Sequence, residues 1–140
     1  MTIRFILNEI KIRVPERTRL KLHIGELFKR KGKDLSALTY VFCSDKYLLS
    51  INKEFLHHND YTDIITFCLS GPVDPIIGEI YISVDRIREN AQFLGLSMNE
   101  ELHRVIFHGA LHLCGYKDKT PNDKKKMTSE EDKNLKLYFH

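Results

Sequence analysis

The stretch from position 105 to position 118 constrains this chain most, because it combines a buried helix with side chains that bind metals. Up to position 114 its residues are apolar apart from His108, Gly109 and His112, and a helix that is apolar all round is a buried helix. The two histidines are four positions apart, so their rings leave one face of the helix on successive turns. Gly115 predicts the end of the helix, because glycine takes a left-handed backbone freely.

Two imidazoles at this spacing can bind one divalent metal ion. Asp118 follows His112 by six residues, and a turn of that length can bring a third ligand to the same ion. Three protein ligands leave one position open, as a catalytic zinc site requires. The alternative is that His108 and His112 are hydrogen-bonded core residues. Position 109 is glycine rather than glutamate, so the peptidase signature HExxH and its general base are absent.

Four segments of the chain resemble the YbeY family of endoribonucleases, in the same order along the sequence. They are His108-Gly109-x-Leu111-His112-Leu113-x-Gly115-Tyr116, Asn52-Lys53-Glu54-Phe55, Thr62-Asp63-Ile64-Ile65-Thr66-Phe67 and Gly78-Glu79-Ile80-x-Ile82-Ser83. The match runs from about residue 45 to residue 118. The resemblance implies a zincin-like fold and a metal-dependent nuclease, specific for single-stranded RNA, that acts in the maturation of ribosomal RNA.

The chain departs from the family pattern at two positions. Asp118 occupies the place of a third histidine; a carboxylate is still a good zinc ligand, but it lowers the net positive charge at the metal. Leu56 occupies the place of an arginine that the resemblance puts in the metal cleft. His57, His58 or a lysine elsewhere are the candidates to replace that positive charge.

Residues for general acid or base chemistry are harder to identify. Glu79, His57 and His58 are the candidates. Glu79 lies in an expected strand and is equally compatible with an exposed strand position, whereas the two histidines lie in a polar loop from Leu56 to Tyr61 and are compatible with simple solvation. His103 lies five residues before His108, which is off the metal face, and we predict it on the surface.

The pattern of the chain predicts an α+β fold, with a four-stranded mixed sheet packed with helices and the metal site on a buried central helix. Short connections between the last two strands predict that they are antiparallel. Ser97 and Glu100 form a capping box that opens the histidine helix. The expected strands cover residues 3–7, 35–43, 62–69 and 76–84, and helices are expected after residues 15, 44, 85, 97 and 120.

Composition is consistent with one domain over residues 1–140, long enough for a core. No stretch approaches the ~20 apolar residues of a membrane span, and the first residues do not resemble a signal peptide. The three cysteines lie in apolar patterns, which favours a reducing cytoplasm. Residues 1–33 carry ten Lys and Arg against three Glu, a charge that suits RNA, although a solvated helix face would have the same composition.

The ligand spacing predicts a hydrolase that binds one zinc ion, or a similar divalent ion, per chain, and the resemblance implies that it acts on single-stranded RNA. The resemblance adds ribosomal RNA and the small ribosomal subunit as partners, with a role in ribosome quality control. Two alternatives stay open. One is a metallohydrolase with another substrate, and the other is a non-enzymatic ribosome-assembly factor whose metal is structural.

Overall fold

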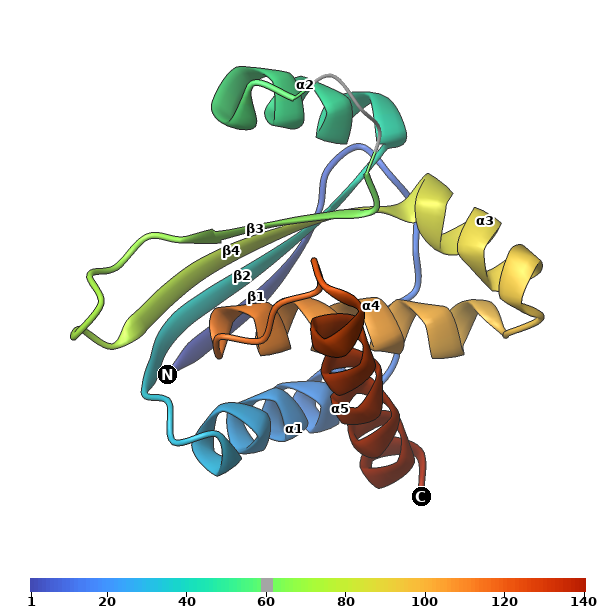
Figure 1. The fold of residues 1–140 in the computed structure, drawn as a ribbon. Coiled ribbons are helices and arrows are strands. Elements are labelled where there is room, and N and C mark those ends of the chain that lie inside the picture. The colour runs from blue at the N-terminus through green and yellow to red at the C-terminus, as the bar shows by residue number, and fades with distance from the viewer. Residues whose placement is uncertain (59–61) are drawn as a thin grey trace.

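The structure, a computed structural model, describes residues 1–58 and 62–140 and shows a sheet with helices on both faces (Figure 1). The strands are β1 (Thr2–Leu7), β2 (Leu35–Cys43), β3 (Ile64–Cys68) and β4 (Ile76–Ser83). The helices are α1 (Arg17–Arg30), α2 (Asp45–Leu56), α3 (Val84–Leu94), α4 (Met98–Leu113) and α5 (Pro121–Phe139). The predicted α+β class is confirmed.

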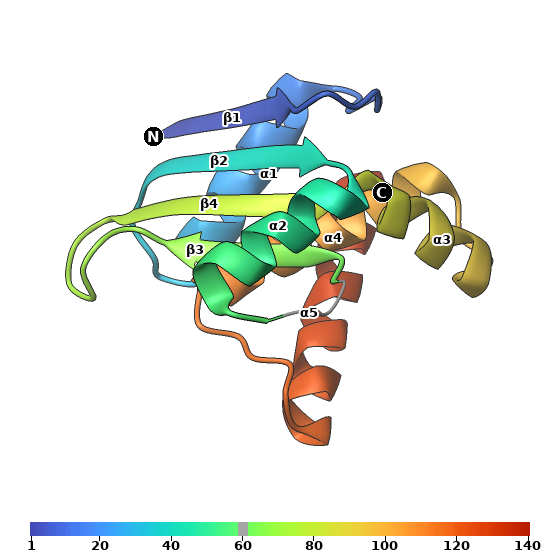
Figure 2. The ribbon, with the colours of Figure 1, turned by 90° about the horizontal axis from the view of Figure 1, so that it is seen from above.

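The sheet is mixed, with the strand order β1-β2-β4-β3 (Figure 2). β1, β2 and β4 run parallel, and β3 is antiparallel to β4. The parallel pairs need long connections, which the helices supply, whereas the short turn between β3 and β4 allows an antiparallel pair. The predicted four-stranded mixed sheet is confirmed, and β3 lies at one of its edges.

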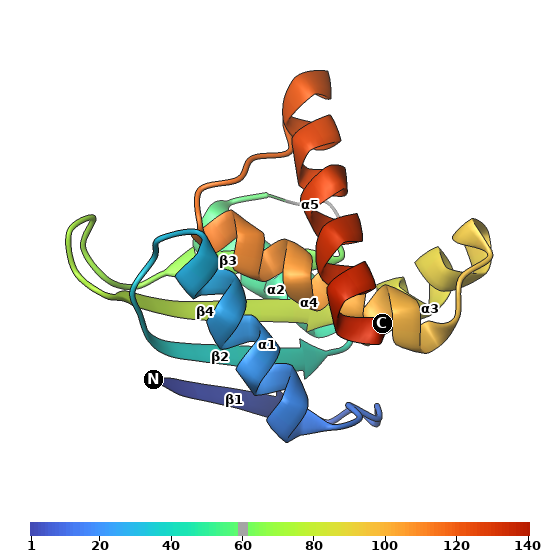
Figure 3. The same ribbon diagram turned by 90° about the horizontal axis from the view of Figure 1, so that it is seen from below.

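Helices cover the two faces of the sheet unequally. α2 lies on one face, and α1 and α4 lie on the other, with α5 packed across α4 (Figures 1 and 3). The main core fills the space between the sheet and α4; within it the Tyr40 hydroxyl of β2 donates a hydrogen bond to the Ile106 carbonyl of α4 at 2.9 Å. Within the described residues, no helix combines the length and apolar character needed to cross a membrane.

The helix that carries the two histidines begins as the sequence predicts. The Ser97 hydroxyl accepts a hydrogen bond from the Glu100 N–H at 3.0 Å, and the Glu100 carboxylate accepts one from the Ser97 N–H at 3.2 Å. This reciprocal capping box satisfies two backbone donors that the first turn leaves free. It therefore fixes where α4 starts.

The prediction that His103 lies on the surface is wrong. Its residue is 1% exposed, and its ring stacks on Tyr138 with centroids 5.0 Å apart and contacts Phe139 edge-on. Both aromatic residues belong to α5, which covers the side of α4 that faces away from the sheet. The periodicity of α4 alone shows only that His103 is off the metal face, and it does not show that another helix covers that face.

Candidate metal centre

The turn after α4 brings the third candidate ligand back to the first two. Gly115 has a positive φ of 102°; its N–H donates to the His112 carbonyl, and the Tyr116 N–H donates to the Leu111 carbonyl, both at 3.0 Å. This pair of bonds is a Schellman motif, which requires the left-handed backbone that glycine adopts at low cost. The predicted helix end at Gly115 is confirmed, and the chain reverses so that Asp118 reaches the histidine face.

Three side chains converge at this turn. The Asp118 Oδ2 atom lies 3.4 Å from the His108 Nε2 atom and 3.3 Å from the His112 Nε2 atom, and one atom of each residue lies within 4.8 Å of the other two. Bonds of about 2.0–2.2 Å to a tetrahedral zinc ion place neighbouring ligand atoms ~3.3 Å apart. The residues present therefore fit a divalent metal ion, and the Asp118 side chain is 43% exposed.

Both histidine rings are oriented by hydrogen bonds from their other nitrogen. The His112 Nδ1 atom lies 2.9 Å from the Tyr116 carbonyl oxygen, and the His108 Nδ1 atom lies 2.5 Å from a Glu131 carboxylate oxygen. Because a carbonyl oxygen only accepts hydrogen bonds, Nδ1 of His112 carries the proton. The Nε2 lone pair then faces Asp118, as a metal ligand requires.

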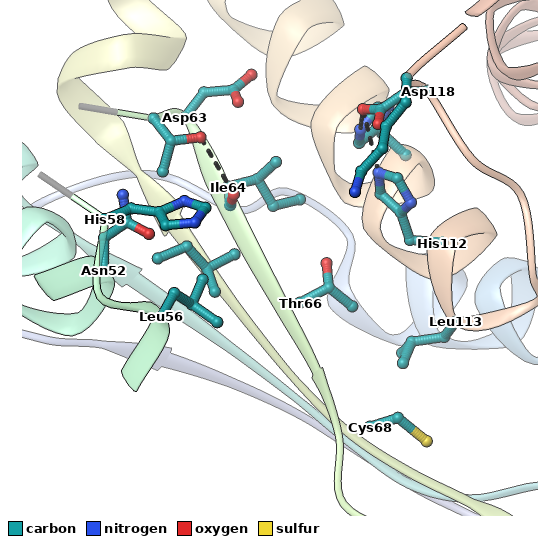
Figure 4. Close-up of a pocket in the computed structure, with 14 residues that line it drawn as sticks. Asn52, Leu56, His58, Asp63, Ile64, Thr66, Cys68, His112, Leu113 and Asp118 are labelled. Carbon is teal, nitrogen blue, oxygen red and sulfur yellow. Dashed lines mark hydrogen bonds and ion pairs between the residues drawn. The ribbon is translucent and has the colours of Figure 1, made fainter. Parts of the chain in front are cut away.

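The three residues line a cavity of about 900 Å³ beside the edge strand β3. Figure 4 shows His112 and Asp118 on the α4 side, Asp63, Ile64 and Thr66 on β3 or just before it, and His58 near the end of α2. The ammonium group of Lys119 also lines the cavity, together with His58 and the two metal-face histidines. The cavity thus places positive charge next to a group that can hold a metal.

The structure separates the candidates for acid and base chemistry. His58 lines the cavity, as does Leu56, whereas His57 ends α2 with a left-handed backbone and is not among the described cavity residues. Glu79 lies on the other face of the sheet from Ile80, where its carboxylate accepts a hydrogen bond from the Tyr81 hydroxyl at 3.1 Å. Residues 59–61 of the expected polar loop lie outside the described residues.

Burial and the hydrogen bond to Glu79 raise the pKa of Tyr81 to about 12. The Tyr81 hydroxyl therefore stays neutral at neutral pH and donates its hydrogen bond to the Glu79 carboxylate. Burial likewise raises the pKa of Cys114 to about 11. The Cys114 thiol is therefore protonated at neutral pH. Because metal ions bind the thiolate form of cysteine, this thiol is a poor candidate for a ligand. Neither group belongs to the set of converging ligand atoms among the described residues.

The basic segment at the start of the chain does not line the cavity. The Lys and Arg residues of positions 1–33 lie outside the described cavity lining, and α1 crosses the sheet from the β1 edge, on the same face as α4 (Figure 3). Some of this charge is used internally, since Lys31 pairs with Glu130 of α5 at 2.8 Å. The cationic side chain that does reach the metal cavity, Lys119, was not singled out from the sequence.

Glu131 is the main residue of the site that sequence reasoning missed. It lies on α5, 23 residues after its partner His108, and its side chain is 4% exposed. A signal was present, because Glu131 lies four residues after Met127 and four before Leu135, on the sparse apolar stripe of that helix. A carboxylate on a buried stripe needs a partner, and here the partner is a candidate metal ligand.

The fold and the site together define a class of protein. It is an α+β protein whose central buried helix carries a group able to hold a metal ion. The model of the protein family Endoribonuclease YbeY matches residues 6–138, and the chain belongs to this family. The endoribonuclease YbeY of Cytophaga hutchinsonii is 43% identical over 136 residues, which covers 97% of this chain and 95% of that protein. The endoribonuclease YbeY of Flavobacterium psychrophilum is 43% identical over 130 residues, covering 93% and 92%.

The fold also has a solved counterpart. The solution structure of TM1509 from Thermotoga maritima superposes with a TM-score of 0.66 and covers 99% of this chain and 89% of that one, at 24% sequence identity. At that identity the likeness concerns the fold. The predicted family is confirmed by the family match and the relatives, and with it the prediction that the chain is an enzyme.

Proposed function

We propose that this protein is a metal-dependent endoribonuclease that cleaves single-stranded RNA during the maturation of ribosomal RNA in the cytoplasm. The observation that carries the proposal is the convergence of His108 and His112 on Asp118 in the lining of a cavity. Membership of a family of endoribonucleases supplies the substrate class. Ribosome quality control, contact with the small subunit and one functional unit over residues 1–140 are parts of the same proposal.

We propose zinc, one ion per chain, as the metal held by His108, His112 and Asp118. A bound divalent ion lowers the pKa of a water molecule and offsets negative charge on a phosphodiester. The converging group has three members among the described residues, a number typical of catalytic zinc sites, which keep a position for water or substrate. That count favours an enzyme over a protein with a structural metal.

The remaining cavity residues would bind and orient the RNA. Lys119 follows Asp118 directly and provides an ammonium group for a backbone phosphate. The Thr66 side chain lines the cavity, and its buried hydroxyl has no hydrogen-bond partner among the described residues, so a rotation of this side chain would present an unused hydroxyl to a sugar or a base. A cavity of about 900 Å³ has the size of a small-molecule site, which suits unpaired nucleotides that can be splayed out of a strand.

The test compares zinc content and RNA cleavage in the wild type, His112→Ala and Asp118→Ala. We expect about one zinc per wild-type chain by elemental analysis, and loss of both metal and cleavage in the two variants. Asp132→Asn, an exposed carboxylate of α5, is the matched control and should behave as the wild type. Asp118→His should keep the metal, because imidazole is also a zinc ligand.

Two outcomes would contradict the proposal. Full zinc content in Asp118→Ala, together with wild-type cleavage of single-stranded RNA, would remove Asp118 from the ligand set. Full zinc content in a wild type that cleaves no RNA would favour the alternative of a ribosome-assembly factor with a structural metal.

A further inference from the structure

We propose that Glu131 of α5 is a positioning residue for the candidate metal ligand His108. The Glu131 Oε2 atom lies 2.5 Å from the His108 Nδ1 atom, while the Nε2 atom of the same ring faces Asp118 at 3.4 Å. A carboxylate at Nδ1 keeps the proton on that nitrogen and leaves Nε2 free to bind a metal. The inference rests on the metal site of the proposed function and adds a residue from a different helix.

Glu131 is itself held by a buried ion-pair network. The Arg104 guanidinium makes two bonds to Glu101, at 2.6 and 2.7 Å, and its Nη1 atom lies 3.2 Å from Glu131 Oε1. The hydrogen bonds to Glu101, and then the charge of both carboxylates, raise the pKa of Arg104, so the guanidinium stays charged. Each Glu131 oxygen therefore has its own donor, and the carboxylate has little freedom to turn.

The ion-pair network has more negative than positive charge, and His108 lies beside the surplus. Glu101 and Glu131 have side chains that are 0% and 4% exposed, and one guanidinium is shared between these two carboxylates. Buried charge without a partner is costly, so the surplus negative charge is best placed beside a group that gains positive character. His108 is in that position, because binding of a cation at Nε2 makes its Nδ1 proton a stronger donor.

The two histidines differ in what holds them. His112 is oriented by the Tyr116 carbonyl of its own helix end, so its orientation depends only on the local turn. His108 is oriented by a side chain of α5, so its orientation depends on the docking of that helix against α4. The geometry thus makes metal affinity depend on α5, which carries no ligand of the converging group among the described residues.

The first measurement is zinc affinity, by competition with a chromogenic chelator, in Glu131→Gln and Glu131→Ala. Glutamine keeps the shape but has one carbonyl oxygen for two donors, so His108 or Arg104 faces an amide group. We expect zinc to bind about 10–100-fold more weakly in both variants. Glu130→Gln is the matched control, because Glu130 pairs with Lys31 at 2.8 Å and also holds α5 in place; it should bind zinc as the wild type does.

The second measurement is the Nδ1 proton resonance of His108 in metal-free protein, at a pH above the ordinary imidazole pKa of about 6.5. In the wild type and Glu130→Gln the proton should be shifted downfield and protected from exchange. In Glu131→Gln it should move upfield or be lost, because an amide oxygen accepts a weaker hydrogen bond than a carboxylate does, while that of His112 remains. This reading identifies the hydrogen bond itself, which a general loss of stability would not do.

Wild-type zinc affinity in Glu131→Gln would overturn the inference, whatever the resonance does. If Glu131→Ala does not fold, Glu131→Gln decides alone. If the wild type itself binds no zinc, the proposed function fails, whereas a protected Nδ1 proton that moves upfield or disappears in Glu131→Gln would still support the positioning of the His108 ring.

Discussion

Gly109 of α4 lies so close to Ile80 of β4 that a Cβ atom at position 109 would come within 2.9 Å of the Ile80 Cδ1 and Cγ2 atoms and 3.0 Å of Ile64 Cδ1. The missing side chain lets the helix settle on the sheet next to β3. The neighbouring His108 thereby lines the cavity beside that strand. A glutamate at position 109, as in HExxH peptidases, would overpack the contact with Ile80 and Ile64.

Gly109→Ala should lower the free energy of unfolding by about 1–3 kcal/mol, because the added methyl group overpacks the contact with Ile80. Denaturant unfolding measures the loss. Ile80→Val, which removes Cδ1, should cost about 0.5–1.5 kcal/mol alone and should relieve part of the clash in the double variant. Strictly additive losses would show that the Ile80 Cδ1 atom is not the group that the new methyl meets.

Removal of the metal should lower the melting temperature of the wild type. The folded chain presents the three ligand atoms together, so the ion binds the folded state. At a free concentration about a thousandfold above the dissociation constant, the ion adds ~4 kcal/mol to the free energy of unfolding. Thermal melts with and without a strong chelator measure the shift. His112→Ala should melt at the same temperature in both conditions, and an equal shift in that variant would place the metal elsewhere.

Thr66→Val should leave stability unchanged or slightly increase it, because the hydroxyl that it removes has no hydrogen-bond partner among the described residues. If that hydroxyl contacts RNA in the cavity, KM for a single-stranded RNA should rise several-fold. Thr128→Val, at an exposed position of α5, is the control for the same change. An unaltered KM would exclude Thr66 from the binding surface.

Acid should destabilise the fold through the buried His103 and the half-buried His23. Burial lowers the pKa of His103 and of His23, against smaller opposing effects of hydrogen bonds to the Asn99 carbonyl and the Asn134 side chain. The unfolded chain then binds protons that the folded chain resists. The stability that this contributes is present above the ordinary pKa of about 6.5 and is lost as pH falls below it toward the lower folded-state values.

Unfolding free energies measured on both sides of that pKa test this expectation. His103→Phe keeps an aromatic ring against Tyr138 and should make stability depend less on pH. His140→Phe, at an exposed position, should leave the pH dependence as it is in the wild type. An unchanged slope in His103→Phe would assign the acid effect to other groups.

The parts of the site that lie close together in the chain were predictable from sequence. The spacing of His108 and His112, the glycine at the helix end and the return of Asp118 depend on helix geometry and turn chemistry, which act over a few residues. The structure brings these three side chains together as expected. The mixed sheet was predictable for a similar reason, since connection lengths decide which strands can be antiparallel.

The parts that depend on α5 were not predictable. His103 was expected in solvent, and Glu131 was not considered, because both assignments require knowing which face of α4 another helix covers. Glu79 shows the same limit in the sheet: alternation places it opposite Ile80, but the sequence does not show which face meets α4. These features follow from tertiary packing, for which a single sequence gives only weak signals.

The order of the site along the chain has a consequence for its assembly during synthesis. The candidate ligands span eleven residues, from His108 to Asp118, whereas the carboxylate that orients His108 follows only at position 131. During synthesis, all three candidate ligands therefore leave the ribosome before Glu131 does. We expect an ion captured by the growing chain to exchange readily until α5 has docked, so that firm retention of the metal marks a finished molecule.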